Sequence, residues 1–324
     1  MKTLGICIPT FRRPDFLARC LESAIRQSQG LALKIFVADD SCTDVNRDVI
    51  AAASSRFGEL HYERNLVNLG INENIRRVVA MADTDYVWLM GEDDYFVAGA
   101  LARVCAEIQS GSYPFVFCNY VLVGDDAGPI GRSALSLPGD LVLGAADFIG
   151  RYLWSAGFMG ACVLDLAEWR RVASDRYLGT YYAHVGYIVE MLGGPAQTVR
   201  VLADPLVANR AEERNFFTWR SDALGVYFGF EQMCRLAAGA VPALAPSLLR
   251  AALVYRKKQG YLSLRNLARM RAERILDAST YRRYLRAANL PIITRLVTLS
   301  VLVVPGRFFE LLLACKRVLL HGKR

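Results

Sequence analysis

Several signatures that assign a chain to a common class are missing from this sequence. The eight cysteines form no C-x-x-C pair, and the three histidines do not stand near them at the spacing of zinc ligands. This pattern excludes a disulfide framework and a zinc finger, and it predicts reduced cysteines packed in a core. The turn Pro9-Thr10-Phe11-Arg12-Arg13 after the first apolar run contains no G-x-G-x-x-G, which argues against a dinucleotide-binding oxidoreductase or a sugar-nucleotide pyrophosphorylase.

Long apolar segments are also missing. No segment reaches the roughly 18–20 uninterrupted apolar residues of a membrane-spanning helix, and the nearest one, Ile292–Val304, contains Arg295. The apolar run before Pro9 is too short for a signal peptide, so we expect the body of the protein to stay in the cytoplasm. The mean hydropathy is nevertheless positive, at +0.22. Some apolar surface is therefore expected to meet a membrane or a partner.

Charge is distributed unevenly along the chain. The formal net charge is +8, yet residues 250–324 hold 17 Lys and Arg against three acidic residues, which leaves residues 1–249 near −6. From Phe216 onward the sequence shows helical periodicity without strand patterns. The sequence thus predicts a first domain over residues 1–215 and a basic helical extension over residues 216–324.

The first domain alternates short apolar runs with longer stretches of helical periodicity, which is typical of an α/β fold with a mostly parallel sheet. The segment Gly124–Gly144 is rich in glycine, proline and aspartate and is expected to be a loop. The predicted strands are Leu4–Pro9, Leu33–Ala38, Glu59–Glu63, Tyr86–Met90, Phe115–Tyr120, Gly160–Leu164 and Val199–Ala203. One predicted helix begins at Pro14, and four more span Asp44–Ala53, Asn72–Met81, Ala98–Gln109 and Ala183–Leu192.

Polar residues follow each of the first four predicted strands at the point where the strand ends. They are Thr10, Asp39-Asp40, Asn68-x-Gly70 and Glu92-Asp93-Asp94. Ligands of open α/β sheets bind at this edge. Adjacent carboxylates repel one another unless a cation lies among them, which favours Mg²⁺ or Mn²⁺ shared with diphosphate oxygens. Taken alone, Asp40 or Asp93-Asp94 could equally form a turn or a helix cap.

These segments resemble glycosyltransferase family 2, whose members are inverting enzymes of the GT-A fold. The resemblance is carried by Ile8-Pro9-Thr10-Phe11-Arg12-Arg13, Val37-Ala38-Asp39-Asp40-Ser41-Cys42-Thr43-Asp44, Asn68-x-Gly70 and Leu89-Met90-Gly91-Glu92-Asp93-Asp94. Within the family the chain is most similar to the abequosyltransferase-like branch, which attaches sugars to lipid-linked O-antigen or related bacterial glycans. The resemblance implies a metal-dependent hexosyltransferase with a UDP- or CDP-type sugar donor and a polyprenyl-diphosphate-linked acceptor.

The resemblance also implies roles for individual residues. Contacts to the donor nucleotide are expected from Pro9, Thr10, Arg12, Asp39, Asp40, Asn72, Asn74 and Asp93, and ligation of Mn²⁺ or Mg²⁺ from Asp94 and Asp93. Asp93 is also expected to act in catalysis, against the donor ribose or sugar. Many family members have an aspartate where this chain has Gly91, so coordination is expected to depend on Asp93 and Asp94. Diphosphate contact is expected from Arg76, Arg12 or Arg210.

An inverting transfer also needs a general base that takes the proton of the acceptor hydroxyl. The Glu-Asp motif that many family members use for this step is not found in the sequence. We predict His184 as the base, because it lies at the start of a predicted helix and has a suitable unperturbed pKa near 6.5. Asp165, Asp175 and Glu190 are the alternatives, and His184 could instead be a helix residue bound to a neighbour.

The basic extension ends in an amphipathic segment, Gly306–His321, with a polar stripe beside a wide apolar face. This pattern favours a helix on an anionic membrane, and hence a peripheral position on the cytoplasmic face of the bacterial inner membrane. A homo-oligomer interface and packing on the catalytic domain are the alternatives. A non-catalytic protein that binds nucleotides or nucleic acid through its basic helices is the rival function, but no recognition motif is present and no nucleic-acid partner is expected.

Overall fold

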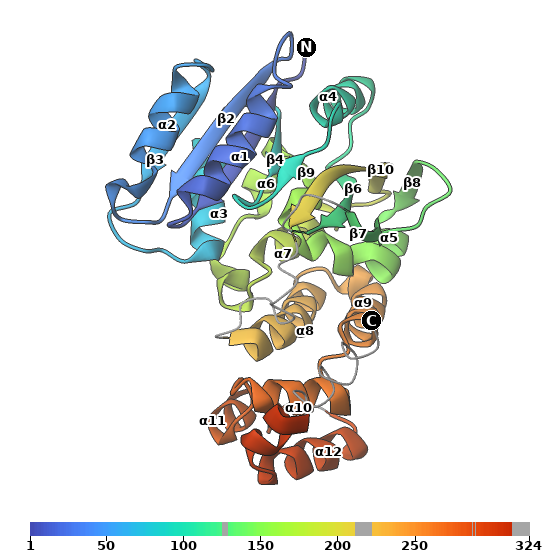
Figure 1. Cartoon of the computed structure of the whole chain (residues 1–324). Coiled ribbons are helices and arrows are strands. Elements are labelled where there is room, and N and C mark those ends of the chain that lie inside the picture. Colours follow the sequence, from blue (N-terminus) through green and yellow to red (C-terminus); the bar gives the residue numbers. More distant parts are fainter. Residues whose placement is uncertain (125–128, 211–221, 287, 289, 313–324) are drawn as a thin grey trace.

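The computed structural model describes residues 1–324 except 125–128, 211–221, 287, 289 and 313–324. An α/β body comes first in the chain, and the residues after the second of these gaps form helices that lie beyond one end of the body (Figure 1). The α/β class and the helical C-terminal region are both confirmed.

A ten-stranded sheet runs through the body in the order β3-β2-β1-β4-β9-β6-β10-β5, with β7 paired to β6 and β8 to β10. The first four strands in this order are parallel, whereas β9 runs antiparallel to both of its neighbours. The strands are β1 (Leu4–Thr10), β2 (Leu33–Asp39), β3 (Leu60–Arg64), β4 (Tyr86–Leu89), β5 (Tyr95–Phe96), β6 (Phe115–Val123), β7 (Pro129–Ser133), β8 (Leu141–Gly144), β9 (Cys162–Asp165) and β10 (Thr198–Arg210).

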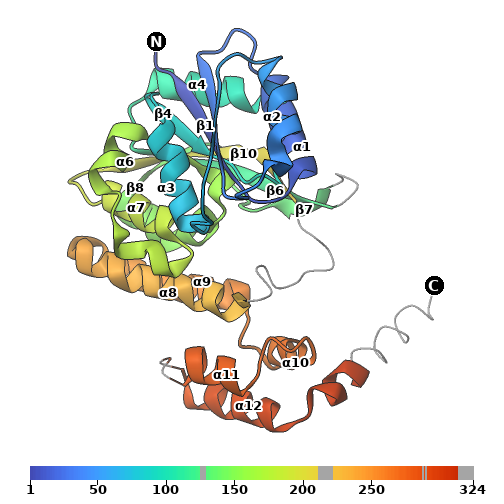
Figure 2. The same cartoon turned by 90° about the vertical axis from the view of Figure 1, so that its left-hand side faces the viewer.

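Helices cover both faces of the sheet. Figure 2 shows α1 and α2 on one side of the strands and α3, α6 and α7 on the other. The helices of the body are α1 (Pro14–Ile25), α2 (Arg47–Ser54), α3 (Ile71–Met81), α4 (Ala100–Ser110), α5 (Ala145–Tyr152), α6 (Leu166–Val172) and α7 (Ala183–Met191), with short 3₁₀ turns η1 (Asp44–Asn46), η2 (Leu153–Gly157), η3 (Met159–Ala161) and η4 (Asp175–Thr180).

Local sequence explains most of these elements. In α1 a proline occupies the first turn, where its missing N–H costs nothing, and the residues Leu17, Leu21 and Ala24 recur on one buried face. The strands β1 and β4 are buried along their whole length, which is why they read as continuous apolar runs without alternation.

The prediction of a loop over Gly124–Gly144 is wrong in part. Residues Pro129–Ser133 form β7 and Leu141–Gly144 form β8, which pair antiparallel with β6 and β10. Neither strand has a strong local pattern, and both exist because a neighbouring strand offers free hydrogen-bonding groups. The two-residue strand β5 has the same origin, since it pairs with β10 where that strand resumes its register after an irregularity between Leu202 and Val207.

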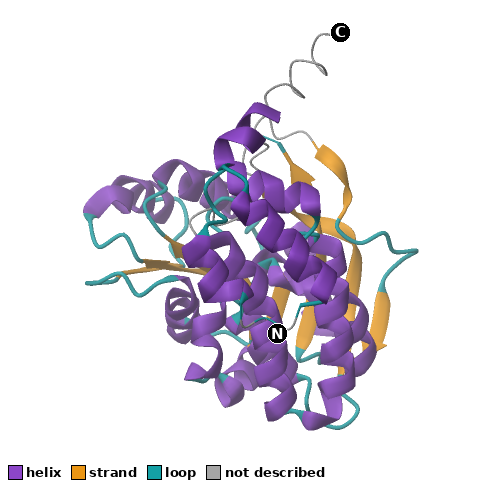
Figure 3. Cartoon of the chain, turned by 90° about the horizontal axis from the view of Figure 1, so that it is seen from below, coloured by secondary structure: helices purple, strands orange, loops and turns teal. Residues whose placement is uncertain are grey.

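Two helices, α8 (Ala223–Ala240) and α9 (Ala245–Gln259), join the body to the rest of the extension. The first packs on α7 and η4, and the second packs on α5. Below them lie α10 (Leu264–Ala272), α11 (Ala278–Thr280), the π-helical turn η7 (Tyr281–Leu285) and α12 (Ile292–Val303), seen from below in Figure 3. The predicted boundary near residue 215 lies outside the described residues, and it stays a prediction because the buried core continues from the sheet into these helices.

A carboxylate links the extension to the body. Asp222 accepts hydrogen bonds from the hydroxyl of Tyr181, at 2.6 Å, and from that of Tyr284, at 2.5 Å. Tyr181 stands in the turn before α7 with a positive φ of 64°, a conformation that is costly for a tyrosine and needs support from its surroundings. Three segments far apart in the sequence are therefore fixed together at one point.

Close packing between α8 and the turn η4 leads to a first prediction. A Cβ at Gly229 would lie 2.0 Å from the carbonyl oxygen of Thr180, whereas a Cβ at Gly239 of the same helix would meet nothing within 4 Å. Gly229→Ala should lower the free energy of unfolding by about 2 kcal/mol or more, because backbone must move. Gly239→Ala should raise it by about 0.5–1 kcal/mol through helix propensity. Urea unfolding of the two variants checks this, and equal midpoints would contradict it.

Candidate active site

The predicted site residues meet at one edge of the sheet, where β1, β2 and β3 end level with one another and the residues that follow β4 continue beside β1. In the parallel register Thr10 of β1 pairs with Asp39 of β2, Asp39 pairs with Arg64 of β3, and Cys7 pairs with Leu89 of β4. The carboxyl ends of four parallel strands therefore form a single edge, where the residues following each strand come together.

The paired aspartates after β2 are buried and hold the surrounding chain in place. Asp39 accepts hydrogen bonds from the backbone N–H of Ser41, the amide of Asn46 and the hydroxyl of Tyr62, at 2.9–3.0 Å. Asp40 accepts from the amide of Asn65 and from the backbone N–H groups of Leu69 and Gly70. Asp40 thereby folds the turn at Asn68-x-Gly70 toward β2, a role that the sequence did not suggest.

Two asparagines of α3 face the same region. Asn74 donates to the carbonyl of Ala38 at 2.9 Å and accepts from Asn65, so Asn65 bridges Asn74 and Asp40. Asn72 donates to the carbonyl of Leu178, and its side-chain oxygen is buried with no described partner. The sequence prediction did not include Asn65, although it directly follows β3 as the other site residues follow their strands.

Glu92 ties the end of β1 to the end of β4. Its carboxylate accepts hydrogen bonds from the hydroxyl of Thr10 and, at 2.9 Å, from the backbone N–H of Phe11. Burial raises the pKa of Glu92 to about 7, although the hydrogen bonds from Thr10 and Phe11 and the charge of Arg13 oppose the shift. Thr10 is 1% exposed and bound to Glu92, so this residue orders the turn that holds Pro9 and Arg12.

Asp93 and Asp94 converge on the space left by a missing side chain. A Cβ at Gly91 would lie 2.6 Å from Oδ2 of Asp94 and 3.1 Å from Oδ1 of Asp93. Asp94 is buried, and its Oδ1 accepts from the backbone N–H of Arg210 at 3.1 Å. Burial, and then the neighbouring charge of Asp93, raises the pKa of Asp94 well above its usual range. Two carboxylates thus share one small space at an energetic cost.

This pair of carboxylates fits a hard divalent cation. In the described part of the chain no group of three or more His, Cys, Asp or Glu side chains is arranged to hold a metal ion. Mg²⁺ and Mn²⁺ at phosphate-binding sites commonly take only one or two carboxylates and complete their shells with phosphate oxygens and water. The two oxygens that face the Cβ position of Gly91 supply that number of ligands.

Arginines surround the carboxylates. Arg13 forms an ion pair with Asp93, at 2.9 Å, and lies 3.8 Å from Glu92. The guanidinium of Arg210 stacks on the ring of Phe16, 4.6 Å from its centroid, beside the backbone bond to Asp94. Arg12 stacks on Phe11 and donates its backbone N–H to Ser41. Of the three arginines expected near the diphosphate, Arg12 and Arg210 thus lie at this edge.

The third of those arginines, Arg76, points elsewhere. It pairs with Asp175 of η4 and with Glu73 of its own helix. Arg13, which the sequence did not single out, takes its place beside the carboxylates.

His184 does not have the surroundings of a general base in this structure. It is 2% exposed, and its Nε2 lies 3.2 Å from the carbonyl oxygen of Ala156, while Nδ1 is buried with no described partner. Burial lowers the pKa of the imidazole to about 4. The imidazole is almost fully buried among the described residues, so the geometry supports the interpretation of His184 as a core residue.

The alternative bases are also engaged in local contacts. Asp165 caps α6 by accepting from the backbone N–H of Glu168, and Glu190 accepts from the hydroxyl of Tyr177. Asp175 pairs with Arg76.

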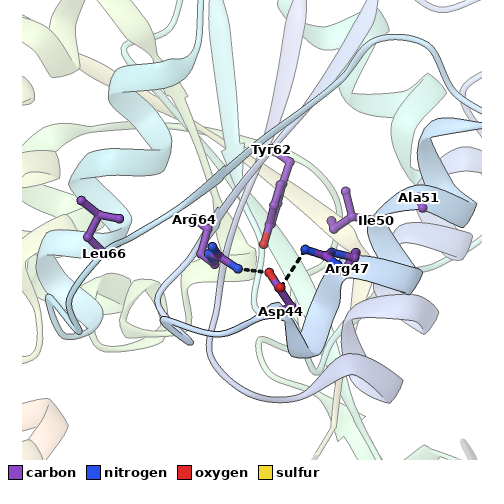
Figure 4. Close-up of a pocket in the computed structure, with 7 residues that line it drawn as sticks. All are labelled: Asp44, Arg47, Ile50, Ala51, Tyr62, Arg64 and Leu66. Carbon is purple, nitrogen blue, oxygen red and sulfur yellow. Dashed lines mark hydrogen bonds and ion pairs between the residues drawn. The ribbon is translucent and has the colours of Figure 1, made fainter.

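An open pocket of about 510 Å³ adjoins the candidate site on the side of α2 and β3 (Figure 4). Its lining includes Asp44 with the two arginines that pair with it, Arg47 and Arg64. Tyr62 also lines it and donates its hydroxyl to Asp39, so this pocket borders the hydrogen-bond network at the end of β2. The residues that line it are Asp44, Arg47, Ile50, Ala51, Tyr62, Arg64 and Leu66.

Comparison with solved structures defines the class of fold. TarS of S. aureus, residues 1–349 in complex with UDP, is similar with a TM-score of 0.61 and 11% identity, covering 83% of this chain and 80% of that chain. The same protein in complex with UDP-GlcNAc gives a TM-score of 0.58 at 13% identity, again covering 83% and 80%. The fold is that of the GT-A glycosyltransferases.

Comparison of sequences indicates a family for the first half of the chain. Residues 5–158 match the family described as Glycosyl transferase family 2. It is 26% identical over 227 residues to the abequosyltransferase RfbV of Salmonella typhimurium, covering 66% of this chain and 68% of that protein. It is 26% identical over 180 residues to a GalNAc(5)-diNAcBac-PP-undecaprenol beta-1,3-glucosyltransferase of Campylobacter jejuni, covering 55% of this chain and 57% of that protein.

The convergence of Asp93 and Asp94 predicts the effect of a methyl group at position 91. Gly91→Ala should displace both carboxylate oxygens, because its Cβ would approach them to 2.6 and 3.1 Å. The affinity for a nucleoside diphosphate in the presence of Mn²⁺, measured by calorimetry, should fall about tenfold to a hundredfold. Gly58→Ala is the control, since a Cβ there meets nothing within 4 Å. Unchanged affinity in Gly91→Ala would contradict the shared site.

The buried histidine predicts a pH dependence of stability. Because folding lowers the pKa of His184 to about 4, the unfolded chain binds this proton more readily between about pH 4 and 6.5. The free energy of unfolding should therefore decrease as the pH falls through this window, by on the order of 3 kcal/mol from this group. His184→Gln should flatten the dependence in urea titrations at several pH values. An identical slope in the variant would show that His184 does not titrate in this way.

Proposed function

We propose that this family 2 enzyme is an inverting glycosyltransferase that moves a sugar from a nucleoside diphosphate donor to a lipid-linked bacterial glycan, with Mg²⁺ or Mn²⁺ as cofactor. The observation that carries the proposal is the convergence of Asp93 and Asp94 on one space at the carboxyl edge of β4. The network of Asp39, Asp40 and Asn65 lies beside it at the ends of β2 and β3.

The donor would lie across this edge with its nucleoside toward β1 and β2. Glu92 orders the turn after β1 by accepting from Thr10 and Phe11, which presents the segment at Arg12 to the nucleotide. Asp40 and Asn65 shape the opposite wall through the turn at Gly70. A UDP-type or a CDP-type donor fits this arrangement, because the carboxylate of Asp40 could accept a hydrogen bond from uracil N3–H or from the cytosine amino group.

The chemistry at the anomeric carbon would occur beside Asp93 and Asp94. These two carboxylates would hold the divalent cation, which when bound stabilises the negative charge of the leaving diphosphate. Arg13 lies against Asp93 and Arg210 lies next to Asp94, so both are placed to balance charge as the diphosphate departs. The acceptor hydroxyl would attack from the opposite face of the sugar, which inverts the anomeric configuration.

The names of two relatives support sugar transfer, and one of these names supports a lipid-linked acceptor. The similar protein of Campylobacter jejuni is named for a substrate on PP-undecaprenol, and the similar protein of Salmonella typhimurium is named for transfer of abequose. The similar S. aureus structures are titled as complexes with UDP and UDP-GlcNAc, which is consistent with a nucleotide-sugar donor. A non-catalytic or nucleic-acid-binding role receives no support from these similarities.

Replacement of the buried carboxylate tests the proposal directly. Asp94→Asn should reduce transfer at least about a hundredfold, because the cation that stabilises the developing charge of the diphosphate loses a carboxylate ligand. Asp83→Asn, an exposed residue paired with Lys34 at the other end of β4, should leave transfer unchanged. Thermal shifts with UDP, CDP, GDP and dTDP, with and without Mn²⁺, report donor binding independently of the acceptor.

The outcomes of these measurements are distinct. Stabilisation by one nucleotide that depends on metal and is lost in Asp94→Asn supports the site and identifies the base. Full activity in metal-free buffer would contradict metal dependence, and the α-configured product of an α-configured donor would contradict inversion.

A further inference from the structure

One helix of the extension leaves an apolar face uncovered. The exposed large side chains of α12 are Ile292, Ile293, Leu296, Leu299 and Val303, with exposures of 66, 73, 56, 40 and 85%. Four of them recur at steps of four, three and four residues, so they lie along one stripe of the helix. Ser300 is the only polar residue exposed with them, and its hydroxyl donates back to the carbonyl of Leu296. This set of five side chains is called the α12 face below.

The opposite side of α12 packs against the rest of the extension. Thr298 and Val301 are buried there, and α12 packs against α10. A soluble amphipathic helix normally turns its apolar stripe toward the core and its polar residues toward water. In α12 the more apolar side faces outward, so the fold of the extension does not explain the α12 face.

The apolar surface continues past the end of α12. The segment Gly306–Leu312 is helical and exposes Phe308, Leu311 and Leu312 by 52, 66 and 52%. Among the described residues no single helix is long and apolar enough to cross a membrane, whereas this segment and α12 together pass by length and composition as a pair bent by 94°. The bend sets their exposed apolar side chains in one surface at the end of the molecule rather than along a straight rod.

Side-chain contacts fix this bend. The guanidinium of Arg271 in α10 donates to the carbonyls of Leu302 and Val304 at 3.3 and 3.2 Å, where the last turn of α12 has no further helical partners. The arrangement of the two helices is thus set by the fold before any partner binds.

The surroundings of the α12 face are strongly basic. Residues 250–312 contain thirteen Lys and Arg against three acidic residues. Arg282, Arg283, Arg286 and Arg307 are exposed within the same helical layer. A second copy of this chain docked on the same face would bring two basic layers together, whereas a surface of anionic phosphates would complement them.

We propose that α10–α12 and Gly306–Leu312 dock on an anionic lipid bilayer, with the α12 face in the boundary between headgroups and acyl chains. The cations around it would contact lipid phosphates, and the apolar side chains would leave water without crossing the membrane. The inference does not rest on the transferase reaction proposed above. The predicted amphipathic helix Gly306–His321 is described only as far as Leu312, so its remainder lies outside the described residues.

Vesicle sedimentation of the full-length protein tests the proposal. The protein should bind vesicles of phosphatidylcholine and phosphatidylglycerol, with weaker binding at high salt and to phosphatidylcholine alone. Ile293→Ser/Val303→Ser should lower the partition coefficient roughly tenfold or more. Leu122→Ser/Val142→Ser, which removes two side chains of 40 and 52% exposure from the body, should bind as the wild type does.

Three outcomes would overturn the proposal. The first is absence of wild-type binding to anionic vesicles at low salt, and the second is unchanged binding of Ile293→Ser/Val303→Ser. The third is a wild-type dimer that does not bind vesicles and becomes monomeric in this variant, because the α12 face would then be a contact between copies. Circular dichroism and nucleotide-induced thermal shifts of each variant separate loss of docking from loss of the fold or of the donor site.

Discussion

The register of the parallel strands β1, β2 and β4 is the constraint on which the candidate site depends. Because β1 hydrogen-bonds to β2 on one side and to β4 on the other, Thr10, Asp39 and the residues after Leu89 come to one edge. A shift of either neighbour by one residue would turn every side chain of that strand to the opposite face. The burial of both faces of β1 and β4 fixes the register and thereby the spacing of the carboxylates.

Three consecutive carboxylates, Glu92, Asp93 and Asp94, follow β4 in a largely buried region of the candidate site. Glu92 and Asp94 both have raised pKa values because burial penalises their ionised forms, and Asp93 adds its charge beside them. Such an arrangement costs stability in the free protein and is typical of functional sites. Hydrogen bonds from Thr10 and Phe11 and the ion pair of Asp93 with Arg13 offset part of this cost. A bound cation would offset the rest of this electrostatic cost.

The extension is joined to the body through its polar contacts as well as its core. Asp222 links Tyr181, in the turn before α7, to Tyr284 in the helical layer that carries α12. Within the extension, Arg256 of α9 pairs with Glu231 of α8 through two hydrogen bonds of 2.8 Å, and these two helices pack on α7 and α5 of the body. A membrane or a partner that binds α10–α12 would therefore also orient the body and its candidate site.

Most of the central fold could be predicted from the sequence, because the strands β1, β2 and β4 and the helices α1 and α3 carry their own apolar patterns and breakers. The short strands β5, β7 and β8 could not, since each depends on a hydrogen-bonding partner that is distant in the sequence. The prediction brought Thr10, Asp40 and Asp94 to one edge from strand endings alone, and the structure places them there. The prediction did not include Asn65 and Arg13, because their roles depend on contacts with Asp40 and Asp93, which are distant in the sequence.

The sequence by itself determined which chemical groups stand at the strand ends, because alternation of apolar runs and polar turns is a local property of the chain. Tertiary structure alone decided how those groups are used. It committed Asp40 to backbone N–H groups around Gly70, buried His184 against the carbonyl of Ala156, and turned the apolar side of α12 outward. These outcomes depend on desolvation and on contacts between distant segments, and neither can be read from spacing along a single chain.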